Sequence, residues 1–160
     1  MRQLSLRPHP EGGWYSEVFR SKAQVTPSGG RGPRSALTSI YFLLAGGQHS
    51  RWHRVLSDEA WHFYEGAPLD LFTVNETFER VEHTRLGPHA SDPSHDQNAT
   101  RPTHVVPAGA WQAVRLTGDY ALVGCTVGPG FDFADFSMLS DDAAHAAKLV
   151  ARFPNLADLV

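Results

Sequence analysis

The chain has 160 residues, of which 41% are hydrophobic and 19% charged, a composition that predicts one globular domain over residues 1–160. A formal net charge of −3 without Lys/Arg clusters argues against nucleic acid as a partner. No apolar run approaches the roughly 20 residues of a membrane span, and the N-terminus lacks the apolar core of a signal peptide. We therefore expect a cytoplasmic protein without a membrane partner, and the single Cys125, which cannot form a disulfide within the chain, fits a reducing compartment.

Short strand-like runs follow one another along most of the chain, separated by turn residues. Thr117-Gly118-Asp119 reads as a tight hairpin turn between the last two runs. Eight or more short strands at this spacing are typical of an antiparallel sandwich or barrel, expected here over about 10–137. The predicted strands are 14–20, 37–44, 52–56, 61–65, 69–74, 80–86, 103–106, 111–116 and 120–127.

Two connections and the C-terminal tail complete the pattern. Residues 27–33 form a loop rich in Gly and Pro, and residues 86–102 form a long polar connection that predicts a lid or an insertion. A short helix is expected over about 140–152. Ser140 can cap it, acidic residues follow, and alanines favour helix.

The densest group of titratable side chains lies at 50–69. His53 and Glu59 would form a polar pair inside a barrel, where a buried charge needs a partner or a purpose. Such a pair can transfer protons, bind a ligand or hold a metal, or it can simply join two strands. His62 is either a second acid–base group or an outward-facing residue of the sheet or of a dimer interface. The candidate catalytic residues are therefore His53, Glu59 and His62.

Strand alternation predicts which neighbours of this pair face the barrel interior and which face outward. If Glu59 faces the barrel interior, so do Trp61 and Phe63. His62 and Tyr64 then face the other way, unless a bulge at the preceding turn resets the alternation. The aromatic side chains can stack on a sugar or a base, or can serve only as core.

A second segment, PAGAWQ at 107–112, has a Pro-x-Gly turn leading into a strand. If Gln112 faces inward, Trp111 faces outward. Glu17, on the first predicted strand, is a further pocket candidate. The candidate ligand-binding residues are Gln112, Trp61, Phe63, Tyr64, Glu17 and Trp111.

The first of these segments resembles the first motif of the cupin superfamily, Gly, five residues, His-x-His, three or four residues, Glu, six residues, Gly. Gly47, His53, Glu59 and Gly66 occupy the matching positions. Val55 stands where the motif has its second histidine. The resemblance implies a metal centre of three His and one Glu, of which this segment retains one His and the Glu.

The second segment resembles the second cupin motif, which contains Pro-x-Gly followed after two residues by a metal histidine. Pro107 and Gly109 match the turn, and Gln112 takes the histidine position, while Arg101 and Leu116 replace the flanking Gly and Asn. A glutamine oxygen is a weak ligand for such metals. The cofactor to test is a divalent metal (Zn, Ni, Mn or Fe) with His53, Glu59 and Gln112 as its ligands.

Four blocks narrow the resemblance to the Cupin_5 (DUF985) family: 9–21 (HPEGGWYSEVFRS), 57–69, 107–113 and 123–136. The family implies an RmlC-like jelly roll, or double-stranded β-helix, that usually forms a homodimer. Its members resemble sugar-nucleotide epimerases in fold, although fold alone does not give function.

Three functions follow as hypotheses. The first is a small-molecule-binding protein of the sugar or sugar-nucleotide type that acts as an epimerase or isomerase by proton transfer. The second is a metal-dependent oxygenase or lyase, and the third is a non-enzymatic ligand sensor. Nothing in the sequence identifies the ligand.

Overall fold

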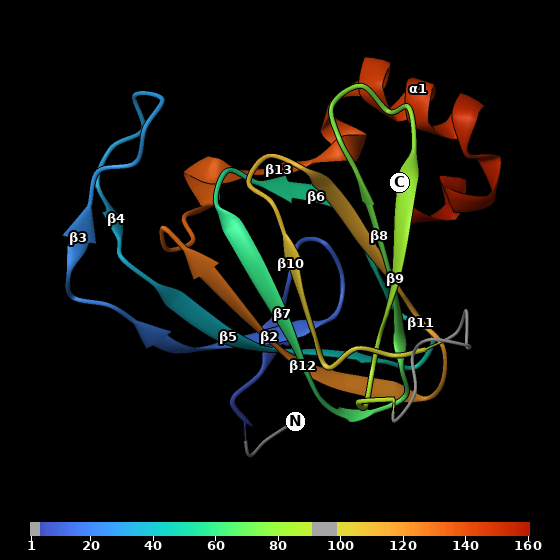
Figure 1. Ribbon diagram of the computed structural model, residues 1–160, viewed down its shortest axis with the longest axis horizontal. Helices are drawn as coiled ribbons and strands as arrows, with labels where there is room; N and C mark the ends of the chain where they lie inside the picture. The colour runs from blue at the N-terminus through green and yellow to red at the C-terminus, as the bar shows by residue number, and fades with distance from the viewer. Residues whose placement is uncertain (1–3, 91–98) are drawn as a thin grey trace.

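Two antiparallel sheets face each other in the computed structural model, which describes residues 4–90 and 99–160 (Figure 1). This architecture confirms the predicted all-β, double-stranded β-helix fold. The six-stranded sheet has the order β1 (Arg7–Pro8), β2 (Trp14–Arg20), β5 (Thr38–Ala45), β12 (Tyr120–Gly128), β7 (Asp58–Gly66) and β10 (Thr103–Val106). The five-stranded sheet has the order β13 (Phe136–Met138), β6 (His49–Val55), β11 (Trp111–Leu116), β8 (Leu69–Val74) and β9 (Val81–Leu86).

A two-stranded arm of β3 (Gln24–Val25) and β4 (Arg34–Ser35) stands away from the two sheets (Figure 1). The loop predicted at 27–33 joins its strands. The arm is tied back by Asp135, whose two carboxylate oxygens accept hydrogen bonds from Arg31 at 3.0 Å and from Arg34 at 2.8 and 2.9 Å. Because Asp135 is buried, this is a shielded ion pair that fixes the base of the arm.

The hairpin predicted at 117–119 is wrong, because β11 and β12 belong to different sheets. The Thr117 hydroxyl donates to the carbonyl oxygen of Pro68 at 2.6 Å, and the Asp119 carbonyl accepts from the Gly46 amide at 3.0 Å. The turn therefore crosses from one sheet to the other instead of pairing its two flanking strands. Turn residues alone do not distinguish these two arrangements.

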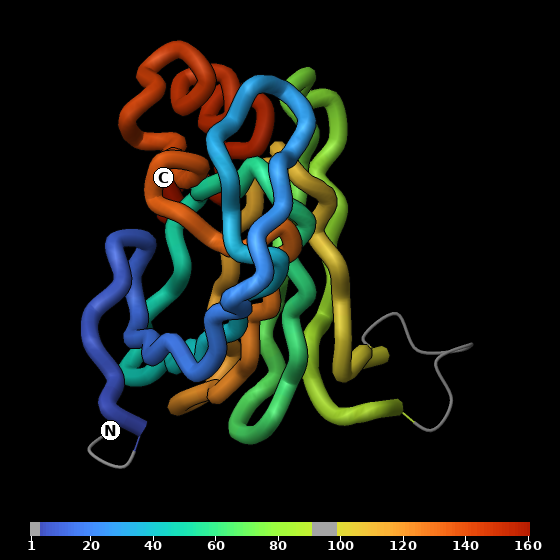
Figure 2. The backbone as a smooth tube through the Cα atoms, turned by 90° about the vertical axis from the view of Figure 1, so that its left-hand side faces the viewer, coloured from blue at the N-terminus to red at the C-terminus, as the bar shows by residue number. Residues whose placement is uncertain are grey.

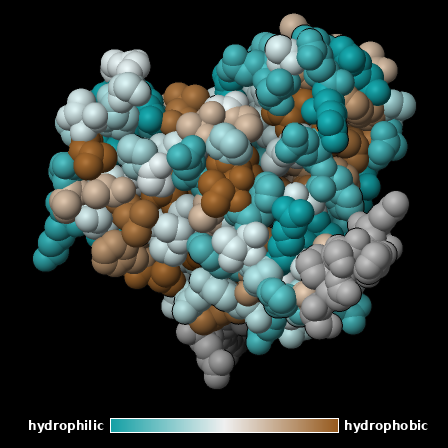
Figure 3. All heavy atoms as spheres, in the orientation of Figure 1, coloured by the Kyte–Doolittle hydropathy of each residue, from teal (hydrophilic) through white to brown (hydrophobic). Residues whose placement is uncertain are grey.

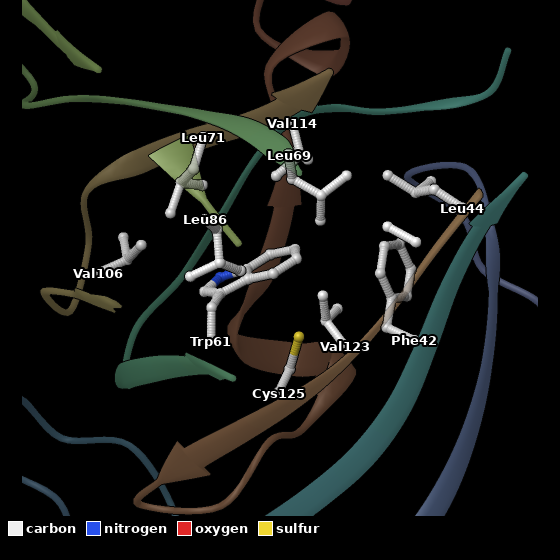
Figure 4. Packing of buried hydrophobic residues seen from close by; sticks show 11 residues of the cluster. Phe42, Leu44, Trp61, Leu69, Leu71, Leu86, Val106, Val114, Val123 and Cys125 are labelled. Atoms are coloured by element: carbon white, nitrogen blue, oxygen red, sulfur yellow. The ribbon is translucent and has the colours of Figure 1, made fainter. Parts of the chain in front are cut away.

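The space between the sheets is filled by an apolar core to which both sheets contribute. Trp61 lies at its centre, with Phe42 edge-on at a centroid distance of 5.8 Å and Val123 and Leu86 beside it (Figure 4). This core occupies one end of the barrel. It leaves the other end to the polar residues described below.

The C-terminal residues cover the outer face of the five-stranded sheet (Figure 1). Trp52 and Trp111 face outward there and pack against Leu149 of helix α1 (Ala143–Arg152). The helix begins later than expected: Asp142, not Ser140, caps it by accepting a hydrogen bond from the His145 amide at 3.1 Å. Short 3₁₀ segments η2 (Phe133–Asp135), η3 (Leu139–Asp141) and η4 (Pro154–Leu159) flank it. In the described part of the chain, no helix combines the length and apolar character needed to cross a membrane.

Candidate functional site

A cavity of about 290 Å³ opens at the end of the barrel that the apolar core leaves free. Its lining comes from an N-terminal loop at 9–13, from strands β1, β2, β5, β6, β7 and β12, and from the segment that follows β12. The lining residues are Arg7, His9, Glu11, Tyr15, Glu17, Arg20, Thr38, Ile40, Phe42, His53, Val55, Glu59, Cys125, Val127, Phe131, Asp132 and Phe133.

The 9–13 loop carries Glu11 into this cavity. The loop closes on itself, since the His9 amide donates to the Gly13 carbonyl and the Gly12 amide to the His9 carbonyl, both at 3.1 Å. It is attached to β6 by the Arg51 amide, which donates to the Glu11 carbonyl at 2.8 Å, and Figure 2 shows the two segments side by side. Gly12 has φ +114°, a conformation that glycine adopts without strain, and a Cβ there would overlap the His49 carbonyl.

Three side chains surround the buried carboxylate of Glu11. The Ser50 hydroxyl donates to Oε1 at 2.7 Å, while His9 Nδ1 and His53 Nε2 lie 3.1 and 3.3 Å from Oε2. Burial alone would raise the pKa of Glu11, but His53, His9 and Ser50 together outweigh burial and hold this pKa below its usual value. Glu11 is therefore a fixed negative charge and a poor base.

The environment of His53 determines which of its ring nitrogens carry hydrogen. Nδ1 lies 2.8 Å from the Arg51 carbonyl oxygen, which can only accept, so Nδ1 carries a hydrogen. Nε2 lies 3.3 Å from Oε2 of Glu11, longer than an ordinary hydrogen bond, so this edge of the ring remains available to a ligand.

Glu59 has a different environment from Glu11, although both carboxyl groups are buried in the same cavity. Its Oε2 accepts a 2.6 Å hydrogen bond from Nε2 of Gln112, whose Oε1 accepts from the Trp61 indole at 2.9 Å. Burial raises the pKa of Glu59, the nearby His53 charge opposes this, and the Glu11 carboxylate adds to it, so the net direction is upward. Glu59 therefore takes up a proton more readily than an ordinary carboxyl group does.

Cys125 lies beside Glu59 on the cavity wall. Burial, followed by the neighbouring carboxylates of Glu59 and Glu11, raises the pKa of its thiol well above the usual value. A protonated thiol is a weak nucleophile, because the thiolate is the reactive form. Cys125 therefore serves as part of the wall.

The structure brings some of the residues predicted from the sequence together and separates others. His53, Glu59 and Glu17 line the cavity, and Gln112 and Trp61 lie directly behind Glu59. Four further candidates do not line the cavity: Phe63 packs against the apolar core, Tyr64 contacts Tyr41 edge-on, Trp111 faces the C-terminal helix, and His62 is likewise not part of the lining.

Sequence reasoning did not single out Glu11, His9 or Ser50 as site residues. Glu11 and His9 belong to the HPEGG segment, whose two glycines permit the tight loop. A buried carboxylate in that loop carries no periodic signal, because its role arises from contact with a distant strand. An acidic residue directly before a glycine pair, within a block that resembles a family signature, was the one available signal.

The predicted metal ligands do not fit a divalent metal. The single acceptor atom of the Gln112 side chain faces the Trp61 indole N–H, which can only donate, so this oxygen is not offered to the cavity. Val55 contributes only an apolar side chain to the wall. Among residues 4–90 and 99–160, no group of three or more His, Cys, Asp or Glu side chains is arranged to hold a metal ion. His53 and Glu59 are the two members of the predicted ligand set that line the cavity.

Comparison with known proteins agrees with this architecture. A structure of a protein from Shewanella oneidensis is 32% identical, with a TM-score of 0.79 over 99% of this chain and 90% of that chain. A hypothetical protein from Leishmania major is 30% identical, with a TM-score of 0.79 over 99% of this chain and 93% of that chain. Oxalate decarboxylase from Bacillus subtilis, at 16% identity and a TM-score of 0.60 over 94% of this chain and 35% of that chain, shares the fold alone.

A search of curated proteins found no match. The family described as Cupin superfamily (DUF985), Cupin_5, matches residues 1–139, which include both sheets and every residue of the cavity. The chain therefore belongs to the Cupin_5 (DUF985) family of the cupin superfamily.

Proposed function

We propose that this cupin binds a small carbonyl compound of the sugar or sugar-nucleotide type and moves a proton next to its carbonyl group, as an epimerase or isomerase does. One observation carries the proposal: two buried carboxyl groups share a cavity but have opposite environments. Glu11 is surrounded by three polar side chains, whereas Glu59 is buried with the Gln112 amide and the Cys125 thiol beside it. Pairs of titratable groups that differ in this way divide acid and base roles between them.

The proton transfer balances within the groups of this cavity. The Glu59 carboxylate takes the hydrogen from the carbon beside the carbonyl, and the C–H electron pair moves into an enolate. The negative charge develops on the carbonyl oxygen, which accepts a hydrogen bond from Nε2–H of His53; the step requires a hydrogen on that nitrogen, and the Glu11 carboxylate lies 3.3 Å from it. In an epimerase the proton returns to the opposite face of the same carbon. In an isomerase it returns to the former carbonyl carbon while the enediol hydroxyl hydrogen moves to the other oxygen, so neither reaction involves net oxidation or reduction.

The volume of the cavity limits the size of the ligand. A volume of about 290 Å³ lies at the low end of ligand pockets, and suits a single sugar ring. Its rim is formed by Arg7, whose guanidinium lies 4.6 Å from the centre of the Tyr15 ring, and by the half-exposed Phe133. A sugar can rest its apolar face on these rings, and any nucleotide portion would remain outside the barrel.

The test is solvent exchange. Free and nucleotide-linked keto sugars are incubated with the protein in deuterated water, and loss of the proton next to the carbonyl is followed by NMR. The wild type is expected to exchange at least one of them, and Glu59→Gln and His53→Gln are expected to lower the rate at least 100-fold. Glu82→Gln, on exposed β9, is the matched control and should keep the wild-type rate. Saturable binding by the wild type with no exchange would favour the non-enzymatic sensor instead.

We further propose that the chain acts as a homodimer, with the side that carries the arm as the contact surface. Figure 3 shows apolar residues gathered on this side of the molecule. Four exposed or half-exposed apolar side chains lie on or next to the arm: Val18, Phe19, Val25 and Leu37. A two-stranded hairpin is marginally stable alone, so the arm would gain from a partner. Light scattering should give twice the chain mass, and Phe19→Asp should reduce it to one chain.

A further inference from the structure

A chain of three buried side chains connects the apolar core to the cavity. The Trp61 indole N–H donates to Oε1 of Gln112 at 2.9 Å, and Nε2 of Gln112 donates to Oε2 of Glu59 at 2.6 Å. Trp61 and Gln112 are each 1% exposed and Glu59 is 7% exposed, so water does not compete strongly for these groups. A buried polar chain whose members are all paired fixes the conformation of each member.

The hydrogen bond from Trp61 to Gln112 fixes which end of the Gln112 amide faces Glu59. An amide side chain can present either its oxygen or its nitrogen to a neighbour, but an indole N–H only donates. Gln112 must therefore turn its oxygen to Trp61, and its NH₂ group then faces Glu59. Trp61 cannot follow a rotation of the amide, because Phe42, Val123 and Leu86 pack around its ring (Figure 4).

We propose that Gln112 is a positioning residue: held by Trp61, it occupies Oε2 of Glu59, so that Oε1 is the oxygen that exchanges a proton with a bound ligand. A carboxyl oxygen that accepts a 2.6 Å hydrogen bond from an N–H group cannot also carry the acid hydrogen toward that donor. The neutral form of Glu59 therefore carries its hydrogen on Oε1. The exchange with a ligand rests on the proposed function, whereas the hydrogen-bond chain does not.

Any test of this proposal has to leave the charges of the other titratable groups around Glu59 unchanged. They are Glu11 and His9 from the N-terminal loop, His53 from β6 and Cys125 from β12. Gln112 is uncharged, so replacing it with leucine removes its hydrogen bonds to Trp61 and Glu59 without removing a charge. Of these two bonds, only the one to Oε2 involves Glu59, so a change in the titration of Glu59 after that replacement reports on this bond.

The experiment measures the titration of Glu59 directly in the ligand-free protein. Glutamate is labelled with ¹³C at the carboxyl carbon, and the Glu59 signal is assigned by its loss in Glu59→Gln. A hydrogen bond to a charged group stabilises it by about 1.5–3 kcal/mol, so Gln112→Leu should raise the titration midpoint by about 1–2 pH units. Trp61→Phe removes only the donor to Gln112 and should raise the midpoint by about half as much.

Trp111→Phe is the matched control, since it removes an indole from the same region of the five-stranded sheet but on its outer face. It should leave the Glu59 midpoint unchanged, and melting curves check that each variant folds. A folded Gln112→Leu with the wild-type midpoint would overturn the proposal. If Gln112→Leu does not fold, Trp61→Phe decides, and an unchanged midpoint there is equally contradictory. A shifted midpoint in a protein that exchanges no sugar proton would contradict the proposed function while upholding this role of Gln112.

Discussion

Oε2 of Glu11 lies 3.3 Å from Nε2 of His53, and both side chains are almost completely buried. The contact joins the N-terminal loop to β6 and places a pair of titratable groups in the lining of the cavity. Buried charges are retained where they are paired and hydrogen-bonded, and here Ser50 and His9 complete the pairing. This arrangement links the stability of the barrel to its proposed chemistry.

Glu11→Gln should weaken both stability and activity. The amide keeps a partner in Ser50 but removes the negative charge that His53 faces. We expect the free energy of unfolding, measured by urea denaturation at pH 7, to fall by about 1.5–3 kcal/mol. The exchange rate should fall at least tenfold, because the negative charge beside Nε2 of His53 is lost. An unfolding free energy within about 0.5 kcal/mol of the wild type, as expected for the exposed Glu82→Gln, would show that the pair contributes little.

Gly12→Ala should displace the loop that carries Glu11. At φ +114° an alanine is strained, and its Cβ would overlap the His49 carbonyl. Gly29→Ala is the control, since Gly29 has φ +83° but no atom within 4 Å of the added Cβ, so it should cost only the left-handed strain of about 1–2 kcal/mol. Thermal unfolding of both variants should show a loss for Gly12→Ala at least twice that for Gly29→Ala. Equal losses would mean that the close approach to His49 is unimportant.

The ion pair of Asp135 with two arginines should make the free energy of unfolding depend on pH. Its hydrogen bonds from Arg34, reinforced by Arg31 against the opposing effect of burial, hold the pKa of Asp135 below its ordinary value. A lowered pKa in the folded state stabilises the protein fully above the unfolded pKa of about 3.9, and this contribution is lost as the pH falls through the folded value.

Asp135→Asn should therefore destabilise the protein by about 2–3 kcal/mol at pH 7, and the difference from the wild type should shrink below about pH 4. Urea denaturation at pH 7, 5, 3.5 and 3 measures this difference. A difference that stays constant down to pH 3 would show that the two arginines do not act through the charge of Asp135.

Metal removal should leave the protein unchanged. With the Gln112 oxygen turned to Trp61, His53 and Glu59 are the remaining members of the predicted ligand set, and two ligands bind a divalent metal weakly. Elemental analysis of untagged protein purified without chelators should find far less than one Zn, Ni, Mn or Fe per chain. Dialysis against EDTA should alter neither melting temperature nor exchange rate. Near-stoichiometric metal that a chelator removes with loss of activity would support the oxygenase or lyase hypothesis.

Much of the fold could be predicted from the sequence, because long strands carry their own pattern. The runs at 14–20, 69–74, 103–106 and 111–116 coincide with β2, β8, β10 and β11. The short strands β1, β3, β4 and β13 were not predicted, since two or three residues form a strand only where a partner strand is already in place. The turn at 117–119 was misread for the same reason: its outcome depends on which sheet each flanking strand joins.

The candidate site was predictable only where strand alternation applied. His53 and Val55 line the cavity as alternation requires, and Trp61 faces the core. Glu11 was beyond this reasoning, because the contact between a loop carboxylate and a histidine on β6 is tertiary. The long connection at 86–102 lies partly outside the described residues, so its role as a lid stays a prediction.

The most direct test of the proposed chemistry is to measure ligand binding and proton exchange on the same keto sugar with the wild type and Glu59→Gln. We predict that both proteins bind it with similar affinity, since Gln can still pair with Gln112, and that only the wild type exchanges the proton beside the carbonyl with deuterated water. Equal exchange rates in the two proteins would contradict the account, because the proton would then be moving without Glu59.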